Sequence, residues 1–308
     1  MRRRFIDYLI IACKGIAMGA ADAVPGVSGG TIAFISGIYE ELITTISNIK
    51  TSLITVWRKE GFKAFWKAAN GSFLLALLTG IIVSFVTFMR LAKYLLEHHP
   101  VLIWSFFFGL IVASIYYVAR QITRWRILTL VAIIVGALIA YYITTLPSMG
   151  NSDNSFFLFF AGAIAICAMI LPGISGSFIL VILGAYKTLS DAIHDFDFKR
   201  LAIFAVGAVV GLLSFSRILK WLFKNYHNAT LALLSGFIVG SLNKVWPWKR
   251  VLSWRTDSEG LKVPFKEESV WPTDFNGDPQ VLYAIALMLI GFFTILVLER
   301  LGSQKNKL

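Results

Sequence analysis

Small and hydroxyl-bearing residues interrupt the apolar sequence at a place whose composition suits the binding of an anion. The stretch "VPGVSGGTIAFISGIYEEL" runs from Val24 to Leu42, and nine largely apolar residues (Thr31–Tyr39) follow its helix breakers. Proline cannot continue a helix and glycine permits tight turns. Nine residues rise only about 14 Å, roughly half the hydrocarbon core, which favours a re-entrant half-helix. The free N–H groups at the start of such a half-helix attract anions.

A second copy of this element follows 147 residues later. "LPGISGSFILVILGAYKTL" at 171–189 is identical to the first copy at nine of 19 positions. A shift of 127 also aligns "RLAKYLL" at 90–96 with "RILKWLF" at 217–223, and "GLIVAS" at 109–114 with "GFIVGS" at 236–241. Two separate matches in the same order indicate a tandem duplication.

The two copies together form the candidate anion site. Two half-helix ends that enter from opposite sides of a membrane would converge on one anionic group, with their hydroxyls as additional donors. The alternative is that these small residues only let helices approach closely. The predicted phosphate-binding residues are Ser28, Gly29, Gly30, Thr31, Ser175, Gly176 and Ser177, and the predicted turn-forming residues are Pro25, Gly26, Pro172 and Gly173.

Ionisable residues near the two breaks are further candidates. Asp22 and Glu40 are candidates for proton coupling, although Asp22 equally fits a pair with Lys14 or a cap of the break, and Glu40 a solvated position. Arg90 and Arg217 recur in both halves, and either attract a phosphate at each membrane face or anchor helix ends. No metal-ligand cluster, P-loop or nucleophile–base pair is visible, so the sequence predicts no metal site, no cofactor and no enzyme.

The composition indicates that the chain which positions these residues is a membrane protein. Hydrophobic residues make up 57% of the 308 positions and charged residues only 15%, too few to cover the surface of a soluble domain. The net charge of +12 comes from residues at the ends of apolar segments. This distribution favours membrane topology and contact with anionic lipid headgroups over nucleic-acid binding.

The predicted fold class is an all-α polytopic membrane protein with an inverted-topology repeat. Each half (1–150 and 151–308) contains a re-entrant broken helical hairpin and three transmembrane helices. The hairpins are expected at 5–46 and 156–190, a basic interfacial helix at 47–70, and a polar loop at 247–280. The expected spans are 72–90, 101–119, 127–146, 201–223, 229–246 and 281–298.

An odd number of spans in each half reverses the orientation of the second copy. The positive-inside rule then predicts that both termini are cytoplasmic, with 47–70 and Arg120–Arg126 also inside. The connection at 147–155, which has no Lys or Arg, is expected outside. The connection Lys187–Arg200 has mixed charge and gives no clear signal. In such folds the substrate binds near the midplane, at the interface of the repeats.

The motifs "GAADAVPGVSGGTIAFISGIYEEL" at 19–42 and "ILPGISGSFILVILGAY" at 170–186 resemble those of the polyprenyl-phosphate transporter family. The resemblance covers essentially the whole chain. It implies a translocase that returns undecaprenyl phosphate to the cytoplasmic leaflet of the inner membrane for cell-envelope glycan synthesis. It also implies a polyprenyl phosphate lipid as the partner. Apart from the resemblance, Asp22 and Glu40 make protons, or another coupling ion, a further candidate partner. A transporter or channel for a small soluble anion is the alternative.

Overall fold

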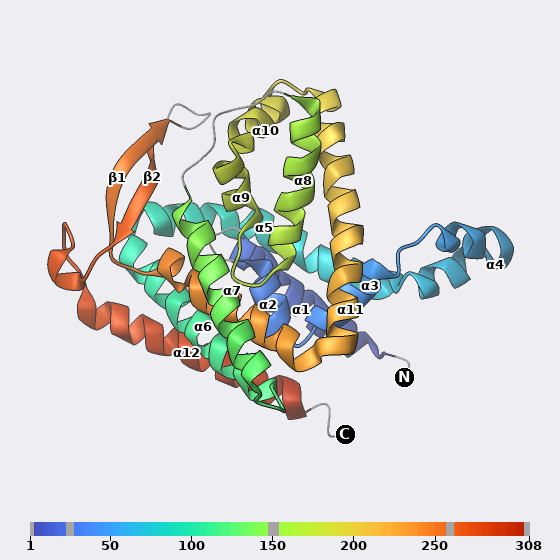
Figure 1. Cartoon of the computed structure of the whole chain (residues 1–308), viewed down its shortest axis with the longest axis horizontal. Coiled ribbons are helices and arrows are strands. Elements are labelled where there is room, and N and C mark those ends of the chain that lie inside the picture. The colour runs from blue at the N-terminus through green and yellow to red at the C-terminus, as the bar shows by residue number, and fades with distance from the viewer. Residues whose placement is uncertain (1–2, 23–27, 147–153, 257–261, 305–308) are drawn as a thin grey trace.

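The computed structural model describes residues 3–22, 28–146, 154–256 and 262–304, and these are mostly helical, as predicted (Figure 1). Each predicted hairpin contains one longer helix followed by two short helices. The elements of the first are α1 (Phe5–Asp22), α2 (Gly29–Ile35) and α3 (Tyr39–Ser47), and those of the second are α8 (Ser155–Ile170), α9 (Gly176–Leu183) and α10 (Ala185–His194).

The segments predicted as spans are also helical. They form α5 (Gly71–His98), α6 (Pro100–Gln121), α7 (Ile127–Thr145), α11 (Phe198–Val245) and α12 (Val281–Gln304). α11 contains two predicted spans, which meet at a non-helical Tyr226 (φ −136°, ψ 46°). Within the described residues, α6, α7 and α11 are each long and apolar enough to cross a membrane. The chain is therefore a helical membrane protein.

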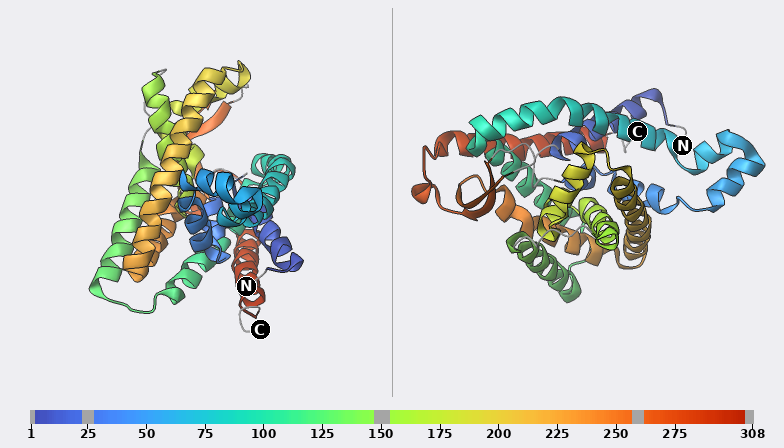
Figure 2. Two further views of the ribbon diagram at one scale, coloured as in Figure 1. Left: turned by 90° about the vertical axis from the view of Figure 1, so that its right-hand side faces the viewer. Right: turned by 90° about the horizontal axis from the view of Figure 1, so that it is seen from above.

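A peripheral helix forms in the basic segment expected at the membrane surface. α4 (Ser52–Ala68) buries only Leu53, and Figures 1 and 2 show it projecting from the helical body. Its direction changes at Gly61, whose φ of +81° is open to glycine at little cost. Exposed Trp57 and Phe62 are suited to a membrane interface, where aromatic side chains are favoured.

A β-hairpin in the polar insert 247–280 departs from the all-α prediction. β1 (Lys249–Thr256) pairs antiparallel with β2 (Lys262–Ser269), and a short 3₁₀ helix, η1 (Pro272–Asp274), follows. Two indole N–H groups tie this insert together, because Trp246 donates to the carbonyl of Val270 and Trp248 to that of Pro279, each at 2.8 Å. Strand pairing and the two tryptophan hydrogen bonds order the insert. Its polar composition did not predict this structure.

Glycines bring α1 against α5, and α8 against α11, at backbone distance. A methyl group on Gly15 would overlap the carbonyl oxygen of Leu77, and one on Gly162 would overlap that of Phe204. These two contacts correspond under the sequence shifts of 147 and 127. Close glycine-mediated crossing is common where helices associate in lipid, because backbones must touch to gain packing energy.

The remaining helices pair across the two halves. α6 packs on α12, and α7 packs on the second part of α11. Among the described residues, five glycines mark these crossings, and each lies against a carbonyl of the opposite helix. The contacts are Gly109 with Met288, Gly291 with Phe106, Gly136 with Leu233, Gly236 with Ile133, and Gly240 with Ala137. A shift of 127 relates Phe106 and Gly109 to Leu233 and Gly236, so each crossing has a counterpart in the other half.

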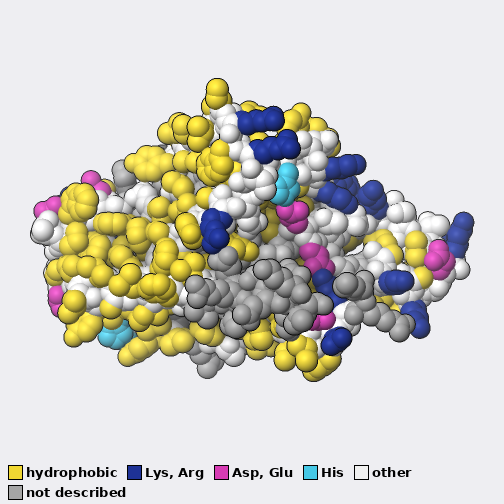
Figure 3. All heavy atoms as spheres, turned by 90° about the horizontal axis from the view of Figure 1, so that it is seen from below, with side chains coloured by type: hydrophobic (Ala, Val, Ile, Leu, Met, Phe, Trp, Pro, Cys, Tyr) yellow, Lys and Arg dark blue, Asp and Glu magenta, His cyan; other side chains and the backbone are white. Residues whose placement is uncertain are grey.

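The exposed side chains of the molecule are those expected of helices that face lipid. Apolar side chains cover a broad area of the face in Figure 3, and Lys and Arg gather toward the end where α4 lies. On α7, Leu138 is 63% exposed and Tyr142 is 65% exposed. Large apolar side chains at such exposure need a non-aqueous partner, which lipid supplies in a membrane.

Candidate substrate site

Two charged residues of α1 hold α2 at its opposite ends. The Gly29 N–H donates to Asp22 Oδ1 at 2.7 Å, and Lys14 Nζ donates to the carbonyl of Ser36 at 2.6 Å. A carboxylate at the start of a helix and an ammonium at its end both oppose the helix dipole favourably. Asp22 and Lys14 therefore act on separate ends of α2, and the direct pair between them considered from the sequence does not form.

The backbone N–H groups at the start of α2 already have hydrogen-bond acceptors within the protein. Ser28 Oγ accepts a hydrogen bond from Gly30 N–H at 3.1 Å, and the Ser28 carbonyl accepts one from Thr31 N–H at 3.0 Å. Ser28 and Thr31 are both 2% exposed. The predicted turn residues Pro25 and Gly26 lie outside the described residues. At this end Asp22 occupies the position that an external anion would take.

The two predicted motifs meet at the centre of the molecule. Thr31 Oγ1 accepts a hydrogen bond from Gly173 N–H at 2.8 Å, although 142 residues separate them. A methyl group on Gly30 would lie 2.6 Å from the carbonyl oxygen of Ile170, so only glycine lets the chains approach this closely. Pro172 is fully buried beside this contact. The structure thus joins Gly30 and Thr31 of one motif to the turn of the other.

The second break differs from the first in its charge. A shift of 147 brings Asp22 to Met169, so no carboxylate occupies the equivalent position before α9. Gly173 turns the chain with a φ of +86°. Ser175 Oγ lies 2.9 Å from Ser177 Oγ, and Ser177 is exposed. The start of α9 is therefore open, whereas the start of α2 is closed.

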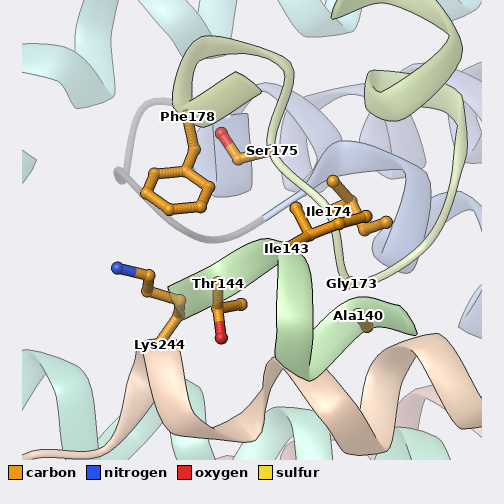
Figure 4. Close-up of a pocket in the computed structure, with 8 residues that line it drawn as sticks. All are labelled: Ala140, Ile143, Thr144, Gly173, Ile174, Ser175, Phe178 and Lys244. Carbon is orange, nitrogen blue, oxygen red and sulfur yellow. The ribbon is translucent and has the colours of Figure 1, made fainter. Parts of the chain in front are cut away.

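A small pocket lies beside this second break (Figure 4). Its walls come from α7, from the turn before α9, from α9 itself and from the end of α11. The lining residues are Ala140, Ile143, Thr144, Gly173, Ile174, Ser175, Phe178 and Lys244. Sequence analysis selected Gly173 and Ser175 but missed Lys244. The available signal was a lone cation near the end of an otherwise apolar span, which indicated only a weaker span.

The remaining charged candidates lie in other contacts. Arg217 donates to the carbonyl of Ile49 at 3.3 Å, beyond the end of α3. Glu40 Oε1 lies 3.1 Å from His227 Nε2, and both side chains are about half exposed. Arg90 belongs to α5, but its side chain is outside the described set. Neither Arg217 nor Glu40 contacts a break in this conformation, so the structure does not join them to the other predicted residues.

The chain is similar to known proteins over most of its length. Residues 18–263 match the model of the family described as undecaprenyl phosphate translocase-like. The chain is 46% identical over 308 residues to a Vibrio cholerae protein named polyprenyl-phosphate transporter, covering 99% of this chain and 100% of that protein. A Staphylococcus aureus protein of the same name is 34% identical over 255 residues, 76% of this chain and 84% of its own length. No solved structure matches the chain.

Proposed function

Because the chain belongs to the undecaprenyl phosphate translocase-like family, we propose that it transports undecaprenyl phosphate across the cytoplasmic membrane. The proposed direction returns the carrier to the inner leaflet, where it is reused for cell-envelope glycan synthesis. The observation that carries the proposal is the identity of 46%, over almost the whole chain, to a protein named polyprenyl-phosphate transporter. We propose that the lipid is transported intact, as the name of this relative implies, and we propose no catalytic step.

An inverted-topology repeat is the architecture that we propose for this activity. The paired glycine contacts support it, since Gly109 and Gly236 each meet the third helix of the other half. Substrate sites in such folds lie near the midplane, where discontinuous helices from the two repeats meet. The hydrogen bond between Thr31 and Gly173 lies at the meeting point of the two breaks and supports that location.

Contacts between polar segments support the proposed orientation, with both termini cytoplasmic. Segments expected inside contact one another, because Arg3 pairs with Glu41 at 2.6 Å and Thr123 N–H donates to Asn228 at 3.0 Å. On the opposite side, Val101 packs with Trp248 of the insert, and the alternation of the predicted spans places both residues at the outer face. Each set is consistent with one face of the membrane.

The proposed mechanism keeps the prenyl chain in lipid and moves only the phosphate through the protein. The phosphate enters between the halves and contacts the hydroxyl and N–H groups of the second break, while the start of α2, where Asp22 accepts from Gly29, forms the closed side. Rocking of one half against the other exposes the site to each leaflet in turn. Arg217 and Arg90 are proposed to attract headgroups at the membrane faces, where basic side chains favour anionic lipids.

A transport assay with a double variant tests the site. Proteoliposomes containing wild-type protein should equilibrate undecaprenyl phosphate between leaflets faster than protein-free liposomes. Ser175→Ala combined with Ser177→Ala should abolish this acceleration while the amount of folded protein stays unchanged. Wild-type transport by the double variant would refute the site assignment. Uptake of a soluble anion without movement of the lipid would instead identify a soluble-anion transporter.

A further inference from the structure

The pocket beside α9 contains a cation that the sequence motifs do not explain. Lys244 Nζ lies 4.3 Å from the centre of the Phe178 ring, and the side chain is mostly buried. In the part of the chain that the structure describes, no carboxylate lies within ion-pair distance of Lys244. Glu267, whose charge acts on Lys244, pairs with Lys249 at 3.6 Å. A largely desolvated ammonium without its own counter-ion favours an anion in the pocket.

The two halves differ in the charged residues that lie at their breaks. At α2 the protein supplies both charges, with Asp22 at the start and Lys14 at the end. At α9 the position equivalent to Asp22 is Met169, and a cation lines the adjacent pocket. The second half therefore has a positive site and lacks the internal carboxylate that fills the first. Lys14 corresponds to Ala161, so the second half lacks both of these charges, and Lys244 is a cation whose position in the first half is taken by Tyr117. An external anion would balance the charge of Lys244.

We propose that Lys244 is the counter-ion of the substrate phosphate, which binds in the pocket between α7, α9 and α11. This inference rests on the proposed function and adds a specific substrate-binding residue to it. Ser175 and Ser177 contribute a hydroxyl donor, because their mutual hydrogen bond uses only one of their two hydroxyl hydrogens. Apolar Phe178 and Ile143 line the same pocket, which has room for about one water molecule in this conformation, so binding of the phosphate requires the pocket to widen.

The position of Lys244 also indicates the leaflet from which the phosphate reaches it. Thr144 and Lys244 lie at the ends of α7 and α11 that precede the segments expected outside. Lys249 Nζ in β1 donates to the Lys244 carbonyl at 2.7 Å and fixes the backbone at this point. Under the proposed orientation, the pocket receives the phosphate from the outer leaflet. The Asp22 end of α2 then forms the closed side of the site.

Binding of undecaprenyl phosphate to purified protein in detergent tests the assignment. Lys244→Met should weaken binding about tenfold or more, since a charge-assisted contact is lost. Lys244→Arg should restore most of the affinity. Lys224→Met is the matched control, because it removes an exposed lysine of the same helix, and it should bind as the wild type does. Equal binding by Lys244→Met and wild-type protein would refute the role of Lys244.

Additional ligands separate this inference from the function on which it rests. Undecaprenol lacks the phosphate and should bind weakly and equally to wild-type protein and to Lys244→Met. If wild-type protein does not prefer undecaprenyl phosphate to undecaprenol, the proposed function fails. Inorganic phosphate should compete only at much higher concentration than the lipid. If it binds as tightly as the lipid, the pocket is a site for free phosphate and the lipid assignment is wrong.

A measurement on unmodified protein avoids any effect of substitution on folding. An amine-reactive reagent is applied with and without saturating undecaprenyl phosphate, and each lysine is quantified by mass spectrometry. The lipid should lower the labelling of Lys244 about fivefold or more, as expected for an ammonium held by phosphate. Labelling of exposed Lys224 should not change. Unchanged labelling of Lys244 at saturating lipid would contradict the proposal.

Discussion

At the scale of single residues, the most informative contacts are those of Asp22 and Lys14. They are eight positions apart on α1, a rise of about 12 Å, and α2 has seven residues, a rise of about 10 Å. The two side chains therefore reach opposite ends of α2. A helix of this length is unstable alone, because too few hydrogen bonds offset the cost of nucleation. Asp22 and Lys14 supply part of the missing stabilisation.

Replacing Asp22 by Ala should destabilise the folded protein by about 1–3 kcal/mol, because the buried N–H of Gly29 loses its acceptor. Asp22→Asn should cost less, since the amide oxygen still accepts a hydrogen bond. The free energy of unfolding in mild detergent measures both effects, and Asp195→Ala, at an exposed position after α10, is the control.

The same variants distinguish this role from proton coupling. If Asp22 carries a proton during transport, Asp22→Asn should retain stability but abolish any dependence of transport on a pH gradient. If Asp22 only caps α2, that dependence should persist in the variant. Wild-type stability of Asp22→Ala would refute the capping role.

At the scale of elements, the β-hairpin is held to the helices through a buried lysine. Lys249 Nζ lies 3.9 Å from the centre of the Trp104 ring on α6, and it also contacts Glu267 and the end of α11. Burial lowers the pKa of Lys249 to about 8, and the nearby charge of Glu267 only partly opposes this change. Lys249 thus connects β1, β2 and two helices at the cost of burying an ammonium group.

Stability should rise with pH in the range set by Lys249. Its pKa of about 8 lies below the value of about 10.4 for an unfolded chain, so between these values the unfolded state binds more protons. The free energy of unfolding should therefore increase from about pH 8 to pH 10. Denaturant titrations at several pH values measure it, and Lys249→Met should remove this increase. An identical pH profile in the variant would refute the assignment.

At the scale of the whole molecule, the orientation of the two faces is open to direct measurement. The contact of Thr123 with Asn228 and the packing of Trp248 on Val101 lie in two separate regions, which we assign to opposite sides of the membrane. A single cysteine at Glu268 should react with an impermeant maleimide in intact cells. A cysteine at Thr123 should react only after permeabilisation. Cys13 and Cys167 must first be replaced, and labelling of both sites in intact cells would refute the proposed topology.

The sequence alone was sufficient for the family, the helical membrane class and the two breaks. These features depend on local chemistry, because a proline beside several glycines interrupts a helix, and long apolar segments favour lipid. The close contact between the two motifs was also expected from their repetition, and the bond between Thr31 and Gly173 brings them together. The β-hairpin was not predicted, because its order depends on pairing and on tryptophan contacts with distant segments.

Tertiary structure alone decided which charges act together. In the sequence, Asp22 was compatible with a cap, a pair or a proton site, and only the position of α2 shows that it accepts from Gly29. Lys244 was indistinguishable from a helix-end anchor until α7 and α9 formed a pocket around it. The physical reason is that a charge takes its role from its neighbours and its desolvation, and both depend on segments far away in the chain.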